Sequence, residues 1–211
     1  MLKTNTLVSE IQSETVRIAI LVSGGGTNLQ ALIDKEATGK LSPCSIELVV
    51  SNNPGAFALK RASEAGIESF VTSDEKELLR ITEEYKIDFL VLAGYLKILS
   101  KDFITKFNKP IINIHPSLIP SFCGKGCYGL HVHEKALEYG VKVSGATVHY
   151  VNEIPDGGEI ILQKAVDVMP DDTPEKLQRR IMEQAEWVLL PKACVKVGKD
   201  ILLKKTKGAI V

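Results

Sequence analysis

The chain has 211 residues, of which 45% are hydrophobic and 25% are charged, enough for one substantial core. Its 26 basic side chains equal its 26 acidic ones, so we expect no nucleic-acid partner, because such binding depends on an excess of positive charge. No run of about 18 apolar residues is present and the four cysteines are sparse, which favours a reduced, cytoplasmic protein with no membrane partner.

The first half of the chain alternates short apolar runs with amphipathic stretches. Strands are expected at 17–23, 46–51, 68–71, 89–93 and 110–115. Helices are expected between them, near 28–36, 56–65, 75–85 and 100–107. Because continuously apolar strands that alternate with helices are typical of a parallel sheet covered on both faces, this half predicts a doubly wound α/β fold.

The second half has a different pattern. Residues 145–151 alternate in polarity, and the segment EIILQKAVDV at 159–168 follows across a turn around Asp156, which predicts two antiparallel strands at the sheet edge. Residues 172–175 then supply an N-cap and a proline for the first turn of a long C-terminal helix. Its buried face is marked by Leu177, Ile181, Ala185 and Val188. We expect a tail over residues 1–16 and a single domain over residues 17–211.

A glycine-rich segment, SGGGTN at residues 23–28, separates the first strand from the first helix. Glycines permit a tight turn there, and the free amides of a helix N-terminus attract an anion. The segment has neither the third glycine of a dinucleotide fingerprint nor the lysine of a Walker loop. We therefore expect Gly26, Thr27 and Asn28 to bind a phosphate monoester. A strand-to-helix turn with no ligand remains an alternative.

Two polar residues end the fifth predicted strand. Asn113 and His115 share one face at its carboxyl end, where open α/β sheets bind ligands. An amide and an imidazolium are both donors, which suits a carbonyl oxygen that gains negative charge. Asp156 follows all four histidines in the chain, and we hypothesise that it forms an acid/base pair with His115. A structural histidine and a plain Asp-Gly turn remain alternatives.

A third cluster resembles a metal site. Cys123 and Cys127 precede His131 and His133, and two thiolates with two imidazoles could hold tetrahedral zinc. Glycines at 124, 126 and 129 interrupt the cluster, however, and indicate a flexible loop. We expect no metal.

Six segments together resemble the glycinamide ribonucleotide formyltransferases in order and spacing, from about Arg17 to Gly198. They are SGGGTN, AGYLKIL at 93–99, NIHPSLIP at 113–120, GLHVH at 129–133, GATVHYV at 145–151 and PDGGEIILQ at 155–163. NIHPSLIP and the Asp-Gly-Gly element are shared with other folate-dependent formyltransferases, so alone they indicate only that superfamily. The glycine segment and the short chain narrow the resemblance to the glycinamide ribonucleotide enzymes. Residues 121–128 form a longer stretch than the compact form of that loop in the family.

The resemblance implies a Rossmann-like formyltransferase fold and transfer of the formyl group of 10-formyltetrahydrofolate to glycinamide ribonucleotide in purine biosynthesis. It implies catalysis by Asn113, His115 and Asp156, with His149 in support. It implies a folate pocket lined by Leu96, Lys97, Ile98, Leu99 and Asn113.

The resemblance also matches Glu186 to an acid that contacts the glycinamide end of the ribonucleotide, although an exposed helical glutamate is an alternative. For the folate glutamate tail, Lys76 is the only basic candidate, and it is not assigned. Without the resemblance, residues 96–99 would be interpreted as buried core that leads into a helix.

Several other functions stay open. Related activities are those of methionyl-tRNA formyltransferase, a sugar amine formyltransferase and formyltetrahydrofolate hydrolase, and an unrelated one is a nucleotide-binding module without catalysis. The tRNA enzyme is expected to carry a further basic domain, and the hydrolase an extra domain ahead of Arg17. We expect small-molecule substrates as the partners of a monomer or homodimer.

Overall fold

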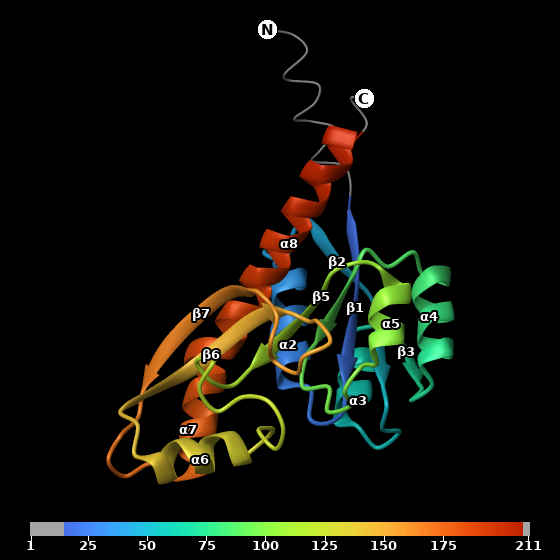
Figure 1. Cartoon of the computed structure of the whole chain (residues 1–211). Coiled ribbons are helices and arrows are strands. Elements are labelled where there is room, and N and C mark those ends of the chain that lie inside the picture. The colour runs from blue at the N-terminus through green and yellow to red at the C-terminus, as the bar shows by residue number, and fades with distance from the viewer. Residues whose placement is uncertain (1–14, 209–211) are drawn as a thin grey trace, which may run out of the picture.

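The computed structural model describes residues 15–208, which form one seven-stranded sheet in the order β3-β2-β1-β4-β5-β6-β7 (Figure 1). The strands are β1 (Val16–Val22), β2 (Cys44–Ser51), β3 (Glu68–Val71), β4 (Phe89–Leu92), β5 (Ile111–His115), β6 (Val143–Tyr150) and β7 (Ile160–Asp167). The first five strands are parallel, while β6 and β7 pair antiparallel at one edge, as predicted. Residues 1–14 of the expected tail lie outside the described residues, and Val16 already belongs to β1.

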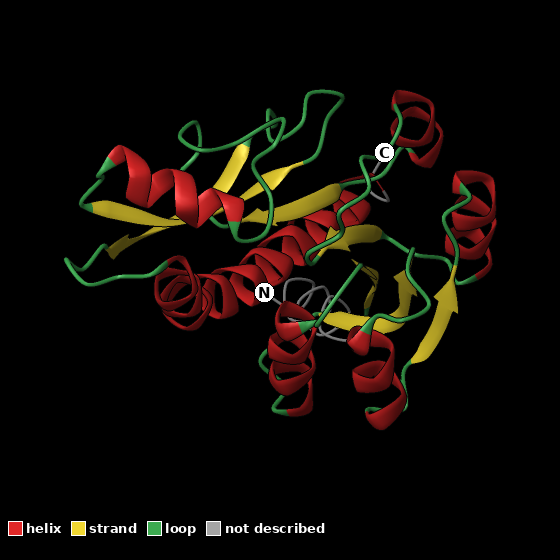
Figure 2. Cartoon of the chain, turned by 90° about the horizontal axis from the view of Figure 1, so that it is seen from below, coloured by secondary structure: helices red, strands yellow, loops and turns green. Residues whose placement is uncertain are grey.

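Helices cover both faces of this sheet (Figure 2). They are α2 (Thr27–Ala37), α3 (Phe57–Glu64), α4 (Glu75–Glu84), α5 (Lys101–Phe107), α6 (His131–Tyr139), α7 (Pro174–Ile181), the π-helical turn η1 (Met182–Glu186) and α8 (Trp187–Gly208). The sequence predicted α2 to α5 and one long C-terminal helix, which the structure divides into α7, η1 and α8, whereas α6 and the π-helical turn were not predicted. In the part of the chain that the structure describes, no helix is long and apolar enough to cross a membrane.

The central strand β1 is buried on both faces. Ile18 and Ile20 pack in one core with α2, α3 and α8, whereas Ala19 and Leu21 pack in the other with α4 and α5. All four side chains are fully buried. This double burial explains why the strand is continuously apolar in sequence instead of alternating.

The C-terminal helices α7 and α8 follow one another with only η1 between them. Thr173 is the N-cap, since its Oγ1 accepts a hydrogen bond from Lys176 N, and Pro174 occupies the first helical turn, as predicted. Three of the four residues assigned to the buried face are fully buried: Leu177, Ile181 and Ala185. Val188 is only partly buried, because it lines a cavity between α2 and α8.

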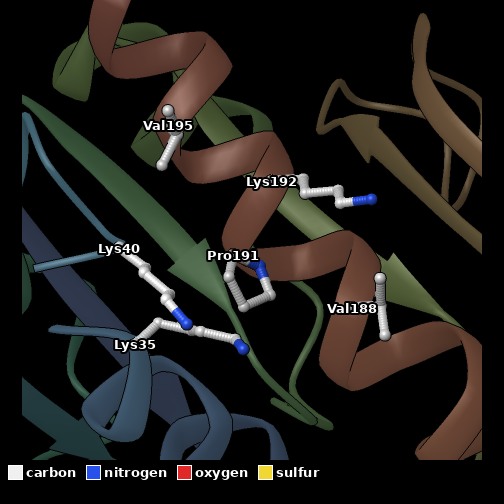
Figure 3. A pocket seen from close by; sticks show the side chains of 6 residues that line it. All are labelled: Lys35, Lys40, Val188, Pro191, Lys192 and Val195. Atoms are coloured by element: carbon white, nitrogen blue, oxygen red, sulfur yellow. The ribbon is translucent and has the colours of Figure 1, made fainter. Parts of the chain in front are cut away.

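That cavity has a volume of about 350 Å³ and is the larger of the two described here. Figure 3 shows its lining, which consists of Lys35, Lys40, Val188, Pro191, Lys192 and Val195. It lies at the carboxyl end of α2, away from the glycine segment that precedes this helix, and no carboxylate, imidazole or thiol lines it. None of the residues to which the sequence assigned a catalytic or binding role lines this cavity.

Candidate active site

The candidate site lies at the point where the order of the strands in the sheet reverses. From β1 the chain continues through β2 to β3, then returns to the other side of β1 as β4. Ser23, just after β1, donates a hydrogen bond to Asn52 Oδ1 (2.7 Å) and accepts one from Leu96 N (2.8 Å). One hydroxyl thus joins the carboxyl ends of β1, β2 and β4, at the switch point where ligands bind in such sheets.

The glycine segment is shaped by close packing against α3. Gly26 has φ +70°, and a Cβ built on it would lie 2.6 Å from the Ala58 Cβ, so only glycine fits. Arg61 Nε donates to Gly25 O at 2.8 Å and holds the segment from the same helix. Because α2 begins at Thr27, the amides of its first turn have no carbonyl partner within the helix, which suits an anion.

Behind this segment lies a buried pair. Asn28 Nδ2 donates to Glu186 Oε2 at 2.6 Å, and both side chains are buried. Burial raises the pKa of Glu186 to about 7, although the hydrogen bond from Asn28 acts in the opposite direction. The alternative of an exposed helical glutamate is therefore wrong. Glu186 ends the π-helical turn η1, a type of irregularity that is frequent at functional sites.

The carboxylate of Asp156 is the centre of the second cluster. Its Oδ2 lies 3.6 Å from His115 Nδ1, and its Oδ1 lies 3.5 Å from both Asn113 Nδ2 and His149 Nε2. Gly124 N also donates to Oδ2 at 2.8 Å. The structure therefore brings together all four residues to which the sequence assigned catalytic or supporting roles, and the roles themselves remain predictions.

The tautomers within this cluster follow from its carbonyl contacts. His149 Nδ1 is 2.8 Å from Tyr150 O, and a carbonyl can only accept, so Nδ1 carries the hydrogen. The Nε2 of a neutral His149 then accepts from Asn113 Nδ2 at 3.1 Å. By the same reasoning His115 Nε2 donates to Phe122 O at 2.9 Å. The amide of Asn113 is thereby oriented, with one N–H directed at His149 Nε2 and the other at Asp156 Oδ1.

Burial and charge act in opposite directions on the acid/base pair. Burial lowers the pKa of His115, which is only 4% exposed, while the neighbouring Asp156 carboxylate acts to raise it. Burial also acts to raise the pKa of Asp156, but the protonated forms of His149 and His115 and the Gly124 N–H outweigh it, so this pKa is lowered. Asp156 is therefore ionised, and the imidazolium predicted for His115 is disfavoured by burial and favoured by Asp156.

Asp156 is both a turn residue and a neighbour of His115. It has φ +56° within a turn closed by a hydrogen bond from Gly157 N to Ile154 O (2.9 Å), so the turn alternative describes the backbone correctly. Its side chain is nevertheless only 14% exposed and reaches His115. Gly158 makes this possible, because a Cβ there would lie 1.7 Å from Tyr150 O and would prevent the close approach of the two segments.

A cavity of about 110 Å³ opens directly beside this cluster. Asn113, His149 and Asp156 line it together with residues 95–99. Leu96 is 62% exposed and Ile98 is 71% exposed, so the alternative of a buried core at 96–99 is wrong for those two positions. The opposite wall, residues 151–155, was not predicted, although its adjacency to Asp156 in sequence was an available signal.

The four residues of the zinc alternative have separate surroundings. Cys123 Sγ donates to Pro120 O at 3.2 Å, and Lys135 Nζ donates to Cys127 Sγ at 3.3 Å. His131 pairs with Glu134 at 2.7 Å, whereas His133 is fully buried. Over residues 15–208, no group of three or more histidine, cysteine or acidic side chains is arranged to hold a metal ion.

Comparison with known proteins gives a consistent result. The family model described as formyl transferase matches residues 16–193. The chain is 41% identical over 181 residues to the trifunctional purine biosynthetic protein adenosine-3 of Drosophila melanogaster, covering 81% of this chain. The chain spans only 13% of the length of that relative.

Other relatives are similar over most of their own length. A phosphoribosylglycinamide formyltransferase of Haemophilus influenzae is 40% identical over 184 residues, which cover 83% of this chain and 84% of the relative. The crystal structure of phosphoribosylglycinamide formyltransferase from Anaplasma phagocytophilum is 40% identical with a TM-score of 0.82, covering 89% of this chain and 88% of that one.

Proposed function

Since the chain belongs to the formyl transferase family, we propose that it transfers the formyl group of 10-formyltetrahydrofolate to the amine of glycinamide ribonucleotide. The products are formylglycinamide ribonucleotide and tetrahydrofolate, and the reaction belongs to purine biosynthesis. The observation that carries the proposal is the position of the Asp156 cluster, at a cavity beside the carboxyl end of β4, with an anion-binding segment at the end of the adjacent strand β1.

The two substrates occupy different parts of this edge. The amides of Gly26, Thr27 and Asn28 bind the ribonucleotide phosphate, and Glu186 lies behind them to accept a hydrogen bond from the same substrate. The folate donor enters the cavity, where Leu96 and Ile98 offer apolar surface to its ring system. The hydrogen bond from Leu96 N to Ser23 fixes the distance between the two parts.

The reaction begins when the amine attacks the formyl carbon. A nitrogen–carbon bond forms, and the carbonyl electron pair moves onto the oxygen. Asn113 Nδ2 donates to this oxyanion, which replaces the longer of its two contacts, the one of 3.5 Å to Asp156. When the tetrahedral intermediate collapses, the bond from carbon to the folate nitrogen breaks.

Proton movement is assigned to Asp156 and His115. The amine nitrogen becomes positively charged when it bonds to the formyl carbon and must then lose a proton, and the departing folate nitrogen must gain one. Asp156 is ionised and lies at the cavity, so it accepts and passes on that proton, while a protonated His115, with Nδ1 3.6 Å from Oδ2, stabilises the carboxylate. No covalent enzyme intermediate and no metal ion takes part.

The test is to mix the protein with 10-formyltetrahydrofolate and glycinamide ribonucleotide and to follow the absorbance of the folate product, with the amine omitted in a control. Product that forms only when the amine is present supports the transferase. Product without the amine indicates the hydrolase, and no product with retained ribonucleotide binding indicates a nucleotide-binding module. A panel of sugar amines and charged methionyl-tRNA separates the remaining formyl acceptors.

A further inference from the structure

The segment between β5 and α6 holds both members of the acid/base pair through its backbone. Phe122 O accepts the hydrogen bond from His115 Nε2 (2.9 Å), and Gly124 N donates to Asp156 Oδ2 (2.8 Å). Cys123 is the residue between these two contacts. Any change that moves the Cys123 backbone therefore alters the surroundings of His115 and Asp156 together.

A second cysteine lies one tight turn away. Cys127 N donates to Gly124 O at 3.0 Å, which closes a turn over residues 124–127. Gly124 and Gly126 both have positive φ, near +79° and +78°, so this turn uses backbone freedom that other residues lack. Both thiols are partly exposed and free. Burial, the Asp156 carboxylate and the neighbouring Cys127 all raise the pKa of the Cys123 thiol, in that order of size. The two thiols therefore lie close to each other.

We propose that Cys123 and Cys127 form a reversible disulfide, an oxidative modification site through which a peroxide inactivates the adjacent acid/base pair. The consequence for activity rests on the proposed function, whereas the formation of the disulfide does not. The two thiols differ in a way that assigns their roles. Lys135 Nζ lies 3.3 Å from Cys127 Sγ, so a thiolate at Cys127 faces an ammonium group, whereas Cys123 lies near the Asp156 carboxylate.

The chemistry needs hydrogen peroxide and no other reagent. The Cys127 thiolate attacks one peroxide oxygen, an S–O bond forms as the O–O bond breaks, and the departing hydroxide takes up a proton to become water. The Cys123 thiolate then attacks the sulfenic sulfur, the S–S bond forms, and the S–O oxygen leaves as a second water molecule. Two thiols and one peroxide thus give one disulfide and two waters, and an external dithiol reverses the change.

The remaining two cysteines provide an internal control. Cys44 and Cys194 are buried, and Cys44 Sγ donates to Cys194 O at 3.2 Å. Burial raises the pKa of Cys44 to about 12 and that of Cys194 well above its ordinary value. Buried thiols of this kind react slowly. Oxidation of the native protein should therefore consume two of its four thiols and leave two.

The experiment treats the full chain with hydrogen peroxide and compares it with Cys123→Ser and Cys127→Ser. In the unsubstituted protein we expect a mass loss of two hydrogen atoms, a linked peptide that contains both cysteines, and a roughly 100-fold loss of formyl transfer, because a displacement of about 1 Å in catalytic groups has that effect. Dithiothreitol should restore activity. Both variants should be active before treatment and retain activity under the same exposure.

The outcomes separate this proposal from the proposed function. If peroxide inactivates Cys127→Ser as strongly as the unsubstituted protein, or if the disulfide forms without loss of activity, the proposal is wrong. Persistence of all four thiols would also overturn it. If the reduced protein transfers no formyl group, the proposed function fails, while the thiol count and the NMR signal of the His115 ring still test the modification site.

Discussion

The glycine segment after β1 and the Asp156 cluster at the ends of β5 and β6 hold their positions by different means. The first is fixed by backbone geometry, a left-handed Gly26 packed against α3 and a hydrogen bond to Gly25 O. The second is built mainly from side chains of four separated positions, with side-chain contacts of 3.5 to 3.6 Å around one carboxylate and one backbone donor, Gly124 N, at 2.8 Å. If the first region binds the ribonucleotide phosphate and the second transfers protons, as proposed, substitutions in the two regions should affect different kinetic parameters.

The largest effect should come from His115→Ala. We expect kcat for formyl transfer to fall by roughly 1,000-fold, the scale on which acid/base groups contribute, while ribonucleotide binding stays unchanged because the glycine segment is untouched. Steady-state kinetics and calorimetric titration with the ribonucleotide measure the two quantities. Equal losses in both would show that the two regions are not separable.

Next in size is Asp156→Asn, which keeps the shape of the side chain and removes its charge. The rate should fall by roughly 100-fold. The carboxylate now raises the pKa of His115 against the effect of burial, so this pKa should decrease in the variant. If activity needs the imidazolium, the alkaline limb of the pH–rate profile should then move to lower pH. An NMR titration of the ring checks the direction, and an unchanged pH profile would leave Asp156 as a turn residue.

Gly26→Ala tests the other region. Its Cβ would meet the Ala58 Cβ at 2.6 Å in a backbone conformation that costs about 1–2 kcal/mol, so the segment must shift. We expect KM for the ribonucleotide to rise by roughly tenfold, with little change in KM for the folate. Gly24→Ala is the matched control, because nothing lies within 4 Å of a Cβ there. A similar effect from both variants would contradict the packing argument.

The smallest effect on turnover is expected from Glu186→Gln, whose main effect should be on the pH dependence of stability. The folded-state pKa of Glu186 is about 7 and the ordinary value is 4.5, so the folded chain holds this proton more tightly and loses stability as pH rises between those values. Glutamine cannot ionise, and its oxygen can still accept from Asn28 Nδ2. The variant should therefore unfold at a higher temperature than the unsubstituted chain at pH 8, with little difference at pH 4.5. Thermal unfolding at both pH values decides this.

The sequence predicted the sheet well because the parallel strands are buried on both faces. Such strands are continuously apolar, as in β1 and β4, and little else in a chain of this kind gives that pattern. Helix α6 was missed for a physical reason. Its fully buried side chains are Val132, His133 and Ala136, of which one is polar. A glycine-rich stretch precedes it and no side chain caps its first turn, so its start is weakly marked in the sequence.

The candidate site likewise has residues that a local sequence pattern predicts and contacts that it does not. Gly26 and Asn28 could be assigned from one short segment, since a turn before a helix is a local feature. The contact between Asn113 and Asp156 joins residues 43 positions apart, and the resemblance suggested it where periodicity could not. Only the resemblance placed Leu96 and Ile98 in the wall of a pocket, because apolar residues after a buried strand are ordinarily interior.

The hydroxyl of Ser23 limits which substitutions position 23 can accept. A hydroxyl has a single hydrogen to give, and Ser23 gives it to Asn52 Oδ1, so its lone pairs are left to receive Leu96 N. These two hydrogen bonds set the spacing between the glycine segment and residues 95–99 of the cavity wall. A larger side chain at position 23 would require compensating changes on both sides at once, so the spacing between the two proposed substrate sites resists gradual change.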